Sequence, residues 1–538
     1  MLTYFIIVPI LVAVLLFMLS HEKVGRAIAI IFQVGFVGAA YYLFTLSQQG
    51  EILTTIGGYE SVLGIVLRAD NVSTVFVLIV AVFFLIASIY SFREKNSRLF
   101  WFLMFLWQGA LVGIFLTRDL FNVFVLIEVV TIVVAILIMF KRKKRYMYDG
   151  MFYLMVNVLV IKFYLFGLGY LYRMTGTLDM HVATQALANI DPSSQMLPYV
   201  LMMTSIAFKS ALFPLFSWLP KAHGSPGAPS AVSAVLSGLH IKCTIYLFLR
   251  VQDMFSAVAS NEFFLVIGII TAVVGFTMAM AQSDIKLILA YSTVSQIGLI
   301  FTALSIGSYY SHIGGMYHIV NHALFKGGLF LSAGAIAKSY GTRNVNEIRG
   351  VLRRYPIVGI ATLIAILGMI GAPFFNGSIS KYFMVSDTTT HMNWILTFLS
   401  LGTIITFIKY STMLFGKPTE PNVNKGADTD VSVADTTIPM EQQISTFILG
   451  ALCFVTGIFG LQSIRFLFGA TVYIDVLGYL EKAGIFFVSL VAGFFIFKYF
   501  VNTNDLLKRV GRYELGFRGV CVCIGVFFAA LLLAVGVL

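Results

Sequence analysis

Charged residues are scarce in this chain. Lysine, arginine, aspartate and glutamate make up only 11% of its 538 residues, while hydrophobic residues make up 59%. In a soluble globular protein about a quarter of the residues are charged. The composition therefore excludes an ordinary soluble domain and indicates a membrane protein.

Signatures of catalytic chemistry are also lacking. The four cysteines lie in apolar segments without the CxxC or Cys/His spacing of a zinc or iron–sulfur site, so we expect reduced, structural thiols. The chain has no GxxxxGKS or GxxxxGKT phosphate loop, and no GxGxxG turn that follows a strand. We therefore expect no cofactor, no ATP hydrolysis and no redox centre in this chain. The energy source should be an ion gradient or a partner subunit.

Apolar runs of about twenty residues recur along the whole chain, and this is the length of a helix that crosses the hydrocarbon core of a membrane. They predict an all-α polytopic membrane protein with about sixteen spans. We place the spans at residues 2–20, 27–47, 71–92, 99–117, 119–140, 150–173, 197–218, 228–251, 262–282, 285–306, 310–339, 355–386, 392–415, 443–464, 478–501 and 515–538.

The basic residues indicate the topology. The net charge of +12 comes from short clusters between the apolar runs, such as Lys141–Arg145 and Lys338–Arg354, and not from a nucleic-acid-binding patch. Such clusters mark the inner loops of membrane proteins. A single assignment of loops to the inner and outer sides of the membrane fits the basic clusters along the whole chain. In it, both termini lie outside a prokaryotic plasma (inner) membrane. The first run lacks a basic start and a small-residue cleavage site, so we expect it to be a retained helix.

Two predicted spans contain helix breaks. Pro214 and Pro220 interrupt the seventh span, and a segment with Pro373 interrupts the twelfth. Paired broken helices of opposite direction are typical of inverted repeats around a midplane site. We predict two inverted five-helix repeats in this organisation: helices 1–3 with an outside β-hairpin (1–98), the first repeat (99–251), the second repeat (262–416), an inner polar linker (417–441) and three C-terminal helices (442–538).

Ionisable side chains inside the spans are candidates for proton transfer, because a charge at the centre of a membrane helix costs about 2.5–3.5 kcal/mol on insertion scales. Glu128 lies midway along the fifth span, and Lys209 precedes the break in the seventh. We expect the two to form an ion pair that acts as a switch on the lysine proton. A static pair that holds two helices in register is the alternative.

The eleventh span carries His318, His322 and Lys326 at positions i, i+4 and i+8. They share a stripe about 80° wide on one helix face. We interpret the stripe as a proton relay, because histidine titrates near neutral pH. We expect no metal site, because no acid in the span completes the ligand set.

Four more ionisable residues lie in predicted spans. Lys242 in the eighth span and Lys381 after the second break extend a line of proton carriers, although Lys381 could instead reach towards the membrane surface. His240 points to a different helix face from Lys242. His240 and Lys162, in the sixth span, stay open as candidates.

Several long motifs occur in a fixed order. They are the GGYESVLGIVLRAD hairpin, TRDLFNVFVLIE, FKSALFPLFSWLPKAH, APSAVSAVLSGLHIK, DIKLILAYSTVSQIG, MYHIVNHALFKGGLFLSAGAI and GAPFFNGSISKY. They resemble the antiporter-like subunits shared by respiratory complex I, Mrp-type multisubunit Na+/H+ antiporters and membrane-bound hydrogenases. The similarity covers roughly residues 50–416 and is nearest to the Mrp-D and hydrogenase-type branches.

The resemblance implies two inverted five-helix repeats and proton transfer along a central hydrophilic axis. It implies that the axis residues are Glu128, Lys209, Lys242, His318, His322, Lys326 and Lys381. Three features depart from the family pattern: Phe216 stands where a histidine is often found, Lys162 is outside the usual set, and two extra spans follow the core.

We therefore expect a proton-translocating antiporter-like subunit of a multisubunit membrane complex. Its expected partners are other membrane subunits, protons and lipid, with Na+ left open and no nucleic acid. A self-sufficient Na+/H+ antiporter is one alternative, disfavoured because no intramembrane carboxylate pair suited to Na+ is visible. A non-conducting scaffold subunit of a redox complex is another, and the full set of polar residues argues against it. Membership of a proton-pumping oxidoreductase stays open.

Overall fold

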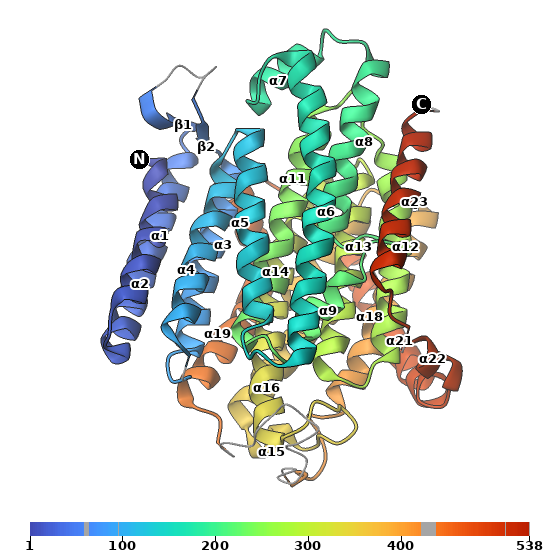
Figure 1. Cartoon of the computed structure of the whole chain (residues 1–538). Coiled ribbons are helices and arrows are strands. Elements are labelled where there is room, and N and C mark those ends of the chain that lie inside the picture. Colours follow the sequence, from blue (N-terminus) through green and yellow to red (C-terminus); the bar gives the residue numbers. More distant parts are fainter. Residues whose placement is uncertain (59–63, 95, 421–436, 512, 537–538) are drawn as a thin grey trace. The chain divides into compact units, whose positions relative to one another are not determined.

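Helices dominate the computed structural model, which describes residues 1–58, 64–94, 96–420, 437–511 and 513–536 (Figure 1). Thirteen helices in these ranges are long and apolar enough to cross a membrane. The protein is thus a mostly helical, multi-pass membrane protein, as predicted. Its chain forms two compact units.

The first unit comprises Met1–Trp218, Leu239–Phe263 and Leu515–Leu538. The last helix of the chain therefore belongs with the N-terminal part, where it packs against the eighth helix. The helices of this unit are α1 (Leu2–Met18), α2 (Glu22–Ser47), α3 (Asn71–Tyr90), α4 (Arg98–Leu116), α5 (Leu120–Ile138), α6 (Lys144–Thr175), α7 (Met180–Leu187), α8 (Pro192–Lys209), α11 (Ile241–Met254) and α23 (Phe517–Gly536).

The second unit comprises Leu219–Gly238 and Phe264–Glu514. Its longest helix, α14, is buried along its whole apolar stretch. The helices here are α9 (Trp218–Gly224), α10 (Ser230–Val235), α12 (Asn261–Ala281), α13 (Ile285–Ser305), α14 (Tyr309–Tyr340), α15 (Val351–Arg354), α16 (Pro356–Ile370), α17 (Asn376–Val385), α18 (Thr390–Ser411), α19 (Met440–Ile458), α20 (Gly460–Phe468), α21 (Val476–Ile496) and α22 (Asp505–Val510).

Three of the predicted spans are not single long helices. The first is α1, which has 17 residues, and the other two are the broken pairs α8/α9 and α16/α17. Helix length and hydropathy thus identify thirteen spans among the described residues, and the expected count of about sixteen stays a prediction. Pro220 does not break a helix, because it lies in the first turn of α9, where proline is tolerated.

The segment after α2 forms an antiparallel hairpin of β1 (Ile52–Thr55) and β2 (Val66–Ala69). Ile52 pairs with Ala69, and a 3-10 turn at Ile56–Gly58 follows β1. The predicted hairpin included residues 59–63, and the predicted linker included residues 421–436; both segments lie outside the described residues.

Asp70 ties this hairpin to two helices. Its carboxylate accepts a hydrogen bond from the Ser73 N–H and so caps α3, and it lies 3.2 Å from the guanidinium of Arg68 and 2.5 Å from that of Arg250 in α11. Burial by itself would raise the pKa of this carboxyl group. The two guanidinium groups outweigh the burial and hold the pKa below its usual value.

The first broken helix ends in a Schellman motif. α8 stops at Lys209, Ala211 has a φ of 56°, and the Leu212 N–H donates to the Ala207 carbonyl. Pro214, which has no N–H, follows and cannot continue the helix. The end of α8 therefore lies inside the fold with its last carbonyl groups near Lys209.

The second broken helix ends in the same way. α16 stops at Ile370, Gly371 has a φ of 82°, and the Ala372 N–H donates to the Leu367 carbonyl. Pro373 follows. The two half-helices thus end in the same Schellman motif, each inside its own unit.

A second matched feature lies at the start of α5 and α13. An isolated β-bridge joins Asp119, before α5, to Asp179, after α6, and another joins Asp284, before α13, to Asn344, after α14. An arginine–aspartate pair spans each bridge: Arg118–Asp179 at 2.7 Å and Arg343–Asp284 at 2.8 Å.

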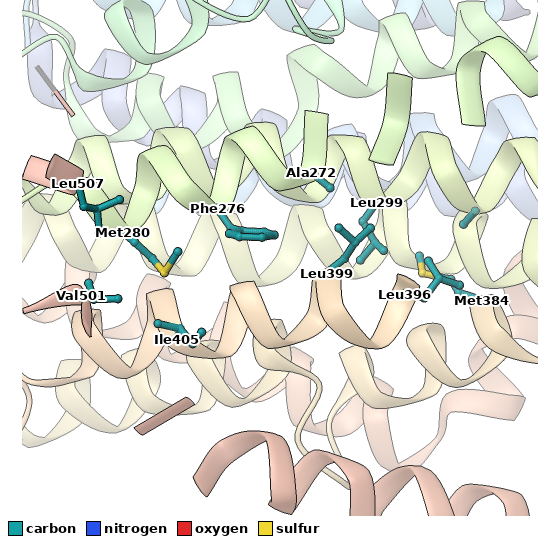
Figure 2. Close-up of a cluster of buried hydrophobic side chains, with 11 residues drawn as sticks. Ala272, Phe276, Met280, Leu299, Met384, Leu396, Leu399, Ile405, Val501 and Leu507 are labelled. Carbon is teal, nitrogen blue, oxygen red and sulfur yellow. The ribbon is translucent and has the colours of Figure 1, made fainter. Parts of the chain in front are cut away.

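A hydrophobic cluster holds the C-terminal helices of the second unit in place (Figure 2). Phe276 of α12 and Leu399 of α18 pack in this cluster with Val501, which ends the π-helical turn Phe497–Val501 after α21, and with Leu507 of α22. Buried apolar area of this kind contributes about 25 cal/mol per Å². The segment α21–α22 is therefore anchored at one end against α12 and α18.

The second break depends on close approach of two glycines. A Cβ atom at position 377 would lie 1.8 Å from the Gly368 carbonyl oxygen. We predict that Gly377→Ala lowers the stability of the protein by about 1–3 kcal/mol or more, because backbone must move. The thermal unfolding midpoint of the purified protein measures this. Gly525→Ala in α23 is the control, since nothing lies within 4 Å of its Cβ position; equal behaviour of the two variants would contradict the account.

Asp70 gives a pH prediction. Because its folded-state pKa is lowered, its charge stabilises the fold above the unfolded pKa, and this contribution is lost as the pH falls through the folded pKa. We expect Asp70→Asn to cost roughly 1–3 kcal/mol at neutral pH. The difference in unfolding midpoint from wild type should stay constant from about pH 8 to pH 5.5 and shrink below about pH 4. A difference that shrinks between about pH 8 and pH 6 would contradict this assignment.

Candidate functional site

Glu128 in α5 forms an ion pair with Lys162 in α6. The distance from Oε1 of Glu128 to Nζ of Lys162 is 3.2 Å, and the lysine Nζ also lies 5.2 Å from the centre of the Phe124 ring. The two side chains are 20% and 44% exposed, near the middle of helices that pack side by side (Figure 1). Lys162, which the sequence left open, is thus the direct partner of the only predicted acid.

Lys209 has neutral partners. Its side chain is 2% exposed, and its Nζ donates to Thr131 Oγ1 at 3.2 Å and to Asn157 Oδ1 at 3.1 Å. The predicted Glu128–Lys209 ion pair is not formed, and both residues are within the described part of the chain. Thr131 lies about one helical turn from Glu128 on the same face of α5. The hydroxyl group that Lys209 contacts is therefore a neighbour of the Glu128 side chain along that face.

The eighth predicted span contains a π-helical turn, Leu236–His240, directly before α11. The Nε2 atom of His240 lies 3.4 Å from the hydroxyl group of Tyr153 in α6, and Lys242 follows two residues later. Both His240 and Lys242 are buried, at 3% and 2% exposure. A π-turn widens a helix locally and occurs often at functional sites.

His318 in α14 is held from both sides. Its Nδ1 atom lies 2.8 Å from Ser380 Oγ of α17, and its Nε2 atom lies 2.9 Å from Gln296 Oε1 of α13. His322 is fully buried one turn further along the same stripe. The predicted stripe thus faces the interior of the second unit.

Lys326, at the end of the stripe, is fully buried and donates to the Leu289 carbonyl at 2.9 Å and to the Ser292 hydroxyl group. Its Nζ atom also lies 5.7 Å from the centre of the Phe407 ring. The two oxygen acceptors and the ring face each stabilise an ammonium group.

Lys381 in α17 folds back on the helix break. Its Nζ atom donates to the carbonyl oxygens of Met369 and Ile370, each at 3.2 Å, and these are the last residues of α16. The C-terminal end of a helix carries partial negative charge, which favours a cation there. The side chain is therefore held at the helix break by these two hydrogen bonds.

Sequence reasoning missed the neutral residues that hold these charges. The signal available was the isolated polar side chain within an apolar helix, which must find a partner when buried. The missed residues are Thr131, Asn157, Ser292, Gln296 and Ser380.

Residues 117–406 match the family model described as NADH:quinone oxidoreductase/Mrp antiporter, transmembrane. The matched range is more than half of the chain. This chain belongs to that family. All seven residues expected on the proton axis lie within the matched range.

Two similar proteins connect this antiporter-family chain to known complexes. The D-type subunit of the Na(+)/H(+) antiporter of Bacillus subtilis (strain 168) is 28% identical over 388 residues, which are 70% of this chain and 78% of that protein. The N-type subunit of the NADH-quinone oxidoreductase of Desulforudis audaxviator (strain MP104C) is 29% identical over 412 residues, 72% of this chain and 81% of that protein.

A solved structure shares the fold of this family member. A chain in the Mrp complex from Dietzia sp. DQ12-45-1b superposes with a TM-score of 0.78 at 22% identity, covering 90% of this chain and 99% of that one. The family match ends within α18, so α19–α23 lie beyond it.

The ion pair between Glu128 and Lys162 gives a test by double-mutant cycle. We predict that Glu128→Gln and Lys162→Gln each lower the thermal unfolding midpoint of the purified antiporter-family protein. The double variant should lose less than the sum, with a coupling energy of about 1 kcal/mol, since Lys162 is partly exposed. Lys162→Arg is the matched control and should retain the coupling. Strict additivity of the two single effects would show that the pair is not formed.

Proposed function

We propose that this chain is a proton-translocating subunit of a multisubunit complex in a prokaryotic plasma membrane. In this proposal both termini lie outside, and other membrane subunits, protons and lipid are the partners. The relatives are subunits by name, one of an Na+/H+ antiporter and one of an NADH-quinone oxidoreductase, which supports an assembly of this kind.

One observation carries the proposal: a lysine lies at each of the two helix breaks. Lys209 ends α8 and Lys381 contacts the last carbonyl groups of α16. Broken helices inside a membrane are tolerated where they line a cavity or are buried in protein. The matched breaks and the matched bridges at Asp119 and Asp284 support two inverted repeats, each with its own proton-carrying lysine.

In the first repeat, Glu128 would act as a switch between two lysines. Paired with Lys162, the carboxylate leaves Lys209 to its neutral partners, Thr131 and Asn157. A carboxylate that moves towards Lys209 would favour its protonated form, and one that moves away would favour proton release. The released proton would pass towards Lys242, which is buried in the same unit.

In the second repeat, the α14 stripe would carry the proton. His318 contacts Ser380, the residue before Lys381, so a hydroxyl group links the histidine to the second break. Lys326 holds the other end of the stripe. Each transfer moves one proton from a protonated nitrogen to a neutral one through a hydroxyl group or water, and the donor becomes neutral.

Na+ coupling is a second candidate, because the named relative from Bacillus subtilis belongs to an Na+/H+ antiporter. In that case this chain would move protons and the complex would move Na+ elsewhere. A self-sufficient Na+/H+ antiporter and a non-conducting scaffold are the two alternatives. Each predicts a different pattern of proton movement after reconstitution into proteoliposomes.

The test is proton movement by the native complex in proteoliposomes, followed with a pH-sensitive dye with and without an Na+ gradient. We predict that Lys326→Gln, if assembled, moves protons at least about tenfold more slowly than wild type, because a proton carrier is removed. Lys338→Gln, at the far end of the same helix, is the control and should keep the wild-type rate. Normal transport by Lys326→Gln would favour the scaffold, and transport by this chain alone would favour the self-sufficient antiporter.

A further inference from the structure

A chain of hydrogen bonds leads from α18 to His318 inside the second unit. The Thr403 hydroxyl group donates to the Leu399 carbonyl at 3.3 Å, and the side-chain amide of Gln296 in α13 donates from Nε2 to Thr403 Oγ1 at 3.1 Å. The other end of that amide, Oε1, lies 2.9 Å from His318 Nε2. The side chains of Gln296, His318 and Thr403 are all buried. Buried polar groups need partners within the protein, so these bonds constrain one another.

The direction of each bond follows from the hydrogen atoms that each group has to give. A hydroxyl group has one hydrogen, and Thr403 gives it to the Leu399 carbonyl, so towards Gln296 the Thr403 oxygen accepts. The amide of Gln296 therefore turns its NH2 group to Thr403 and its oxygen to His318. An amide oxygen accepts and does not donate, so the hydrogen in this bond lies on His318 Nε2. Neutral His318 then has its lone pair on Nδ1.

The partner of Nδ1 suits both protonation states of the ring. Ser380 Oγ lies 2.8 Å from Nδ1, and its hydroxyl group can also donate to the carbonyl groups of Asn376 at 3.3 Å and Gly377 at 3.2 Å. Ser380 donates to Nδ1 of the neutral ring. When Nδ1 carries a proton, it donates to Ser380 Oγ instead, and the serine hydrogen turns to one of the two carbonyl groups. His318 thus gains a proton at Nδ1 without losing a hydrogen bond.

We propose that Gln296 is a positioning residue that fixes the Nε2–H tautomer of His318, with Thr403 holding the Gln296 amide, so that His318 binds and releases its proton only at Nδ1. Protonation forms the Nδ1–H bond, leaves the Nε2–H bond intact and places the positive charge on the ring; release breaks the Nδ1–H bond. The proton then arrives and leaves on the side of Ser380 and the second helix break. That this proton is a transported one rests on the proposed function, whereas the tautomer can be measured without transport.

An amide suits this task better than a carboxylate. Both accept the hydrogen of Nε2, but a carboxylate beside the ring would also favour its protonated form and retain the proton. Gln296 fixes the tautomer of His318 without adding that charge.

Solid-state NMR of the native complex in liposomes tests the tautomer directly. The histidines are labelled with 13C and 15N, and the signals of His318 are those that disappear in His318→Gln. Correlation with Cγ or Cδ2 identifies each ring nitrogen as Nδ1 or Nε2, and a bare nitrogen resonates well apart from a protonated one. At about pH 9, where a histidine side chain is ordinarily neutral, we expect a bare Nδ1 and about tenfold or more Nε2–H over Nδ1–H tautomer. An excess no greater than that of free histidine in water, or a hydrogen on both nitrogens, would overturn the proposal.

Thr403 acts on His318 through Gln296, so its variants test the chain of bonds. Thr403→Val removes the acceptor of the Gln296 NH2 group and should lower the tautomer ratio about threefold or more, while Thr403→Ser retains the hydroxyl group and should keep the ratio. Thr406→Val is the matched control, because the Thr406 hydroxyl group is also buried on α18 and donates to the Gly402 carbonyl. Equal ratios in Thr403→Val and wild type would overturn the role of Thr403. The wild-type spectrum decides the tautomer even if a variant does not assemble.

Proton transport in proteoliposomes tests the consequence. Thr403→Val should move protons several-fold more slowly than wild type, while Thr403→Ser and Thr406→Val should keep the wild-type rate. A lowered tautomer ratio with a wild-type rate would show that the transported proton does not pass through Nδ1 of His318. If the wild-type complex moves no protons, the proposed function fails, while the NMR measurement still decides the tautomer.

Discussion

A charged side chain inside a membrane must have a partner within reach, and this constraint explains much of the structure. Glu128 meets it with a direct ion pair to Lys162. Two buried lysines donate hydrogen bonds to neutral groups: Lys209 to an amide and a hydroxyl group, and Lys326 to a carbonyl and a hydroxyl group. Neutral partners stabilise an ammonium group less firmly than a carboxylate does.

The broken helices supply the remaining partners. A continuous membrane helix uses all its carbonyl groups internally, whereas each break frees the last ones of a half-helix. Lys381 takes two of these, from Met369 and Ile370. Schellman motifs at Ala211 and Gly371 satisfy other backbone groups at the two helix ends. The same solution in both units supports the proposed inverted repeat from the backbone as well as from the sequence pattern.

The positions of helices and helix breaks were predictable from the sequence. The direction in which each side chain points around its helix axis was not. Hydropathy located the helices, and proline with glycine located the breaks at 210–217 and 371–375. The partner of Glu128 was wrongly predicted, because sequence fixes the depth of a residue along a helix but not which neighbour its side chain faces. Lys162 and Lys209 lie on different helices that both bring polar groups to α5.

We propose that Glu128 moves between Lys162 and Lys209 as the protein works. The most direct measurement is an experimental structure of the native complex in lipid at two pH values, one mildly acidic and one mildly alkaline, at a resolution that places the Glu128 side chain. We expect the carboxylate to contact Lys162 in one condition and to shift towards Lys209, displacing the Thr131 hydroxyl group, in the other. A carboxylate that keeps its 3.2 Å contact with Lys162 in both structures would contradict the switch and leave a static pair.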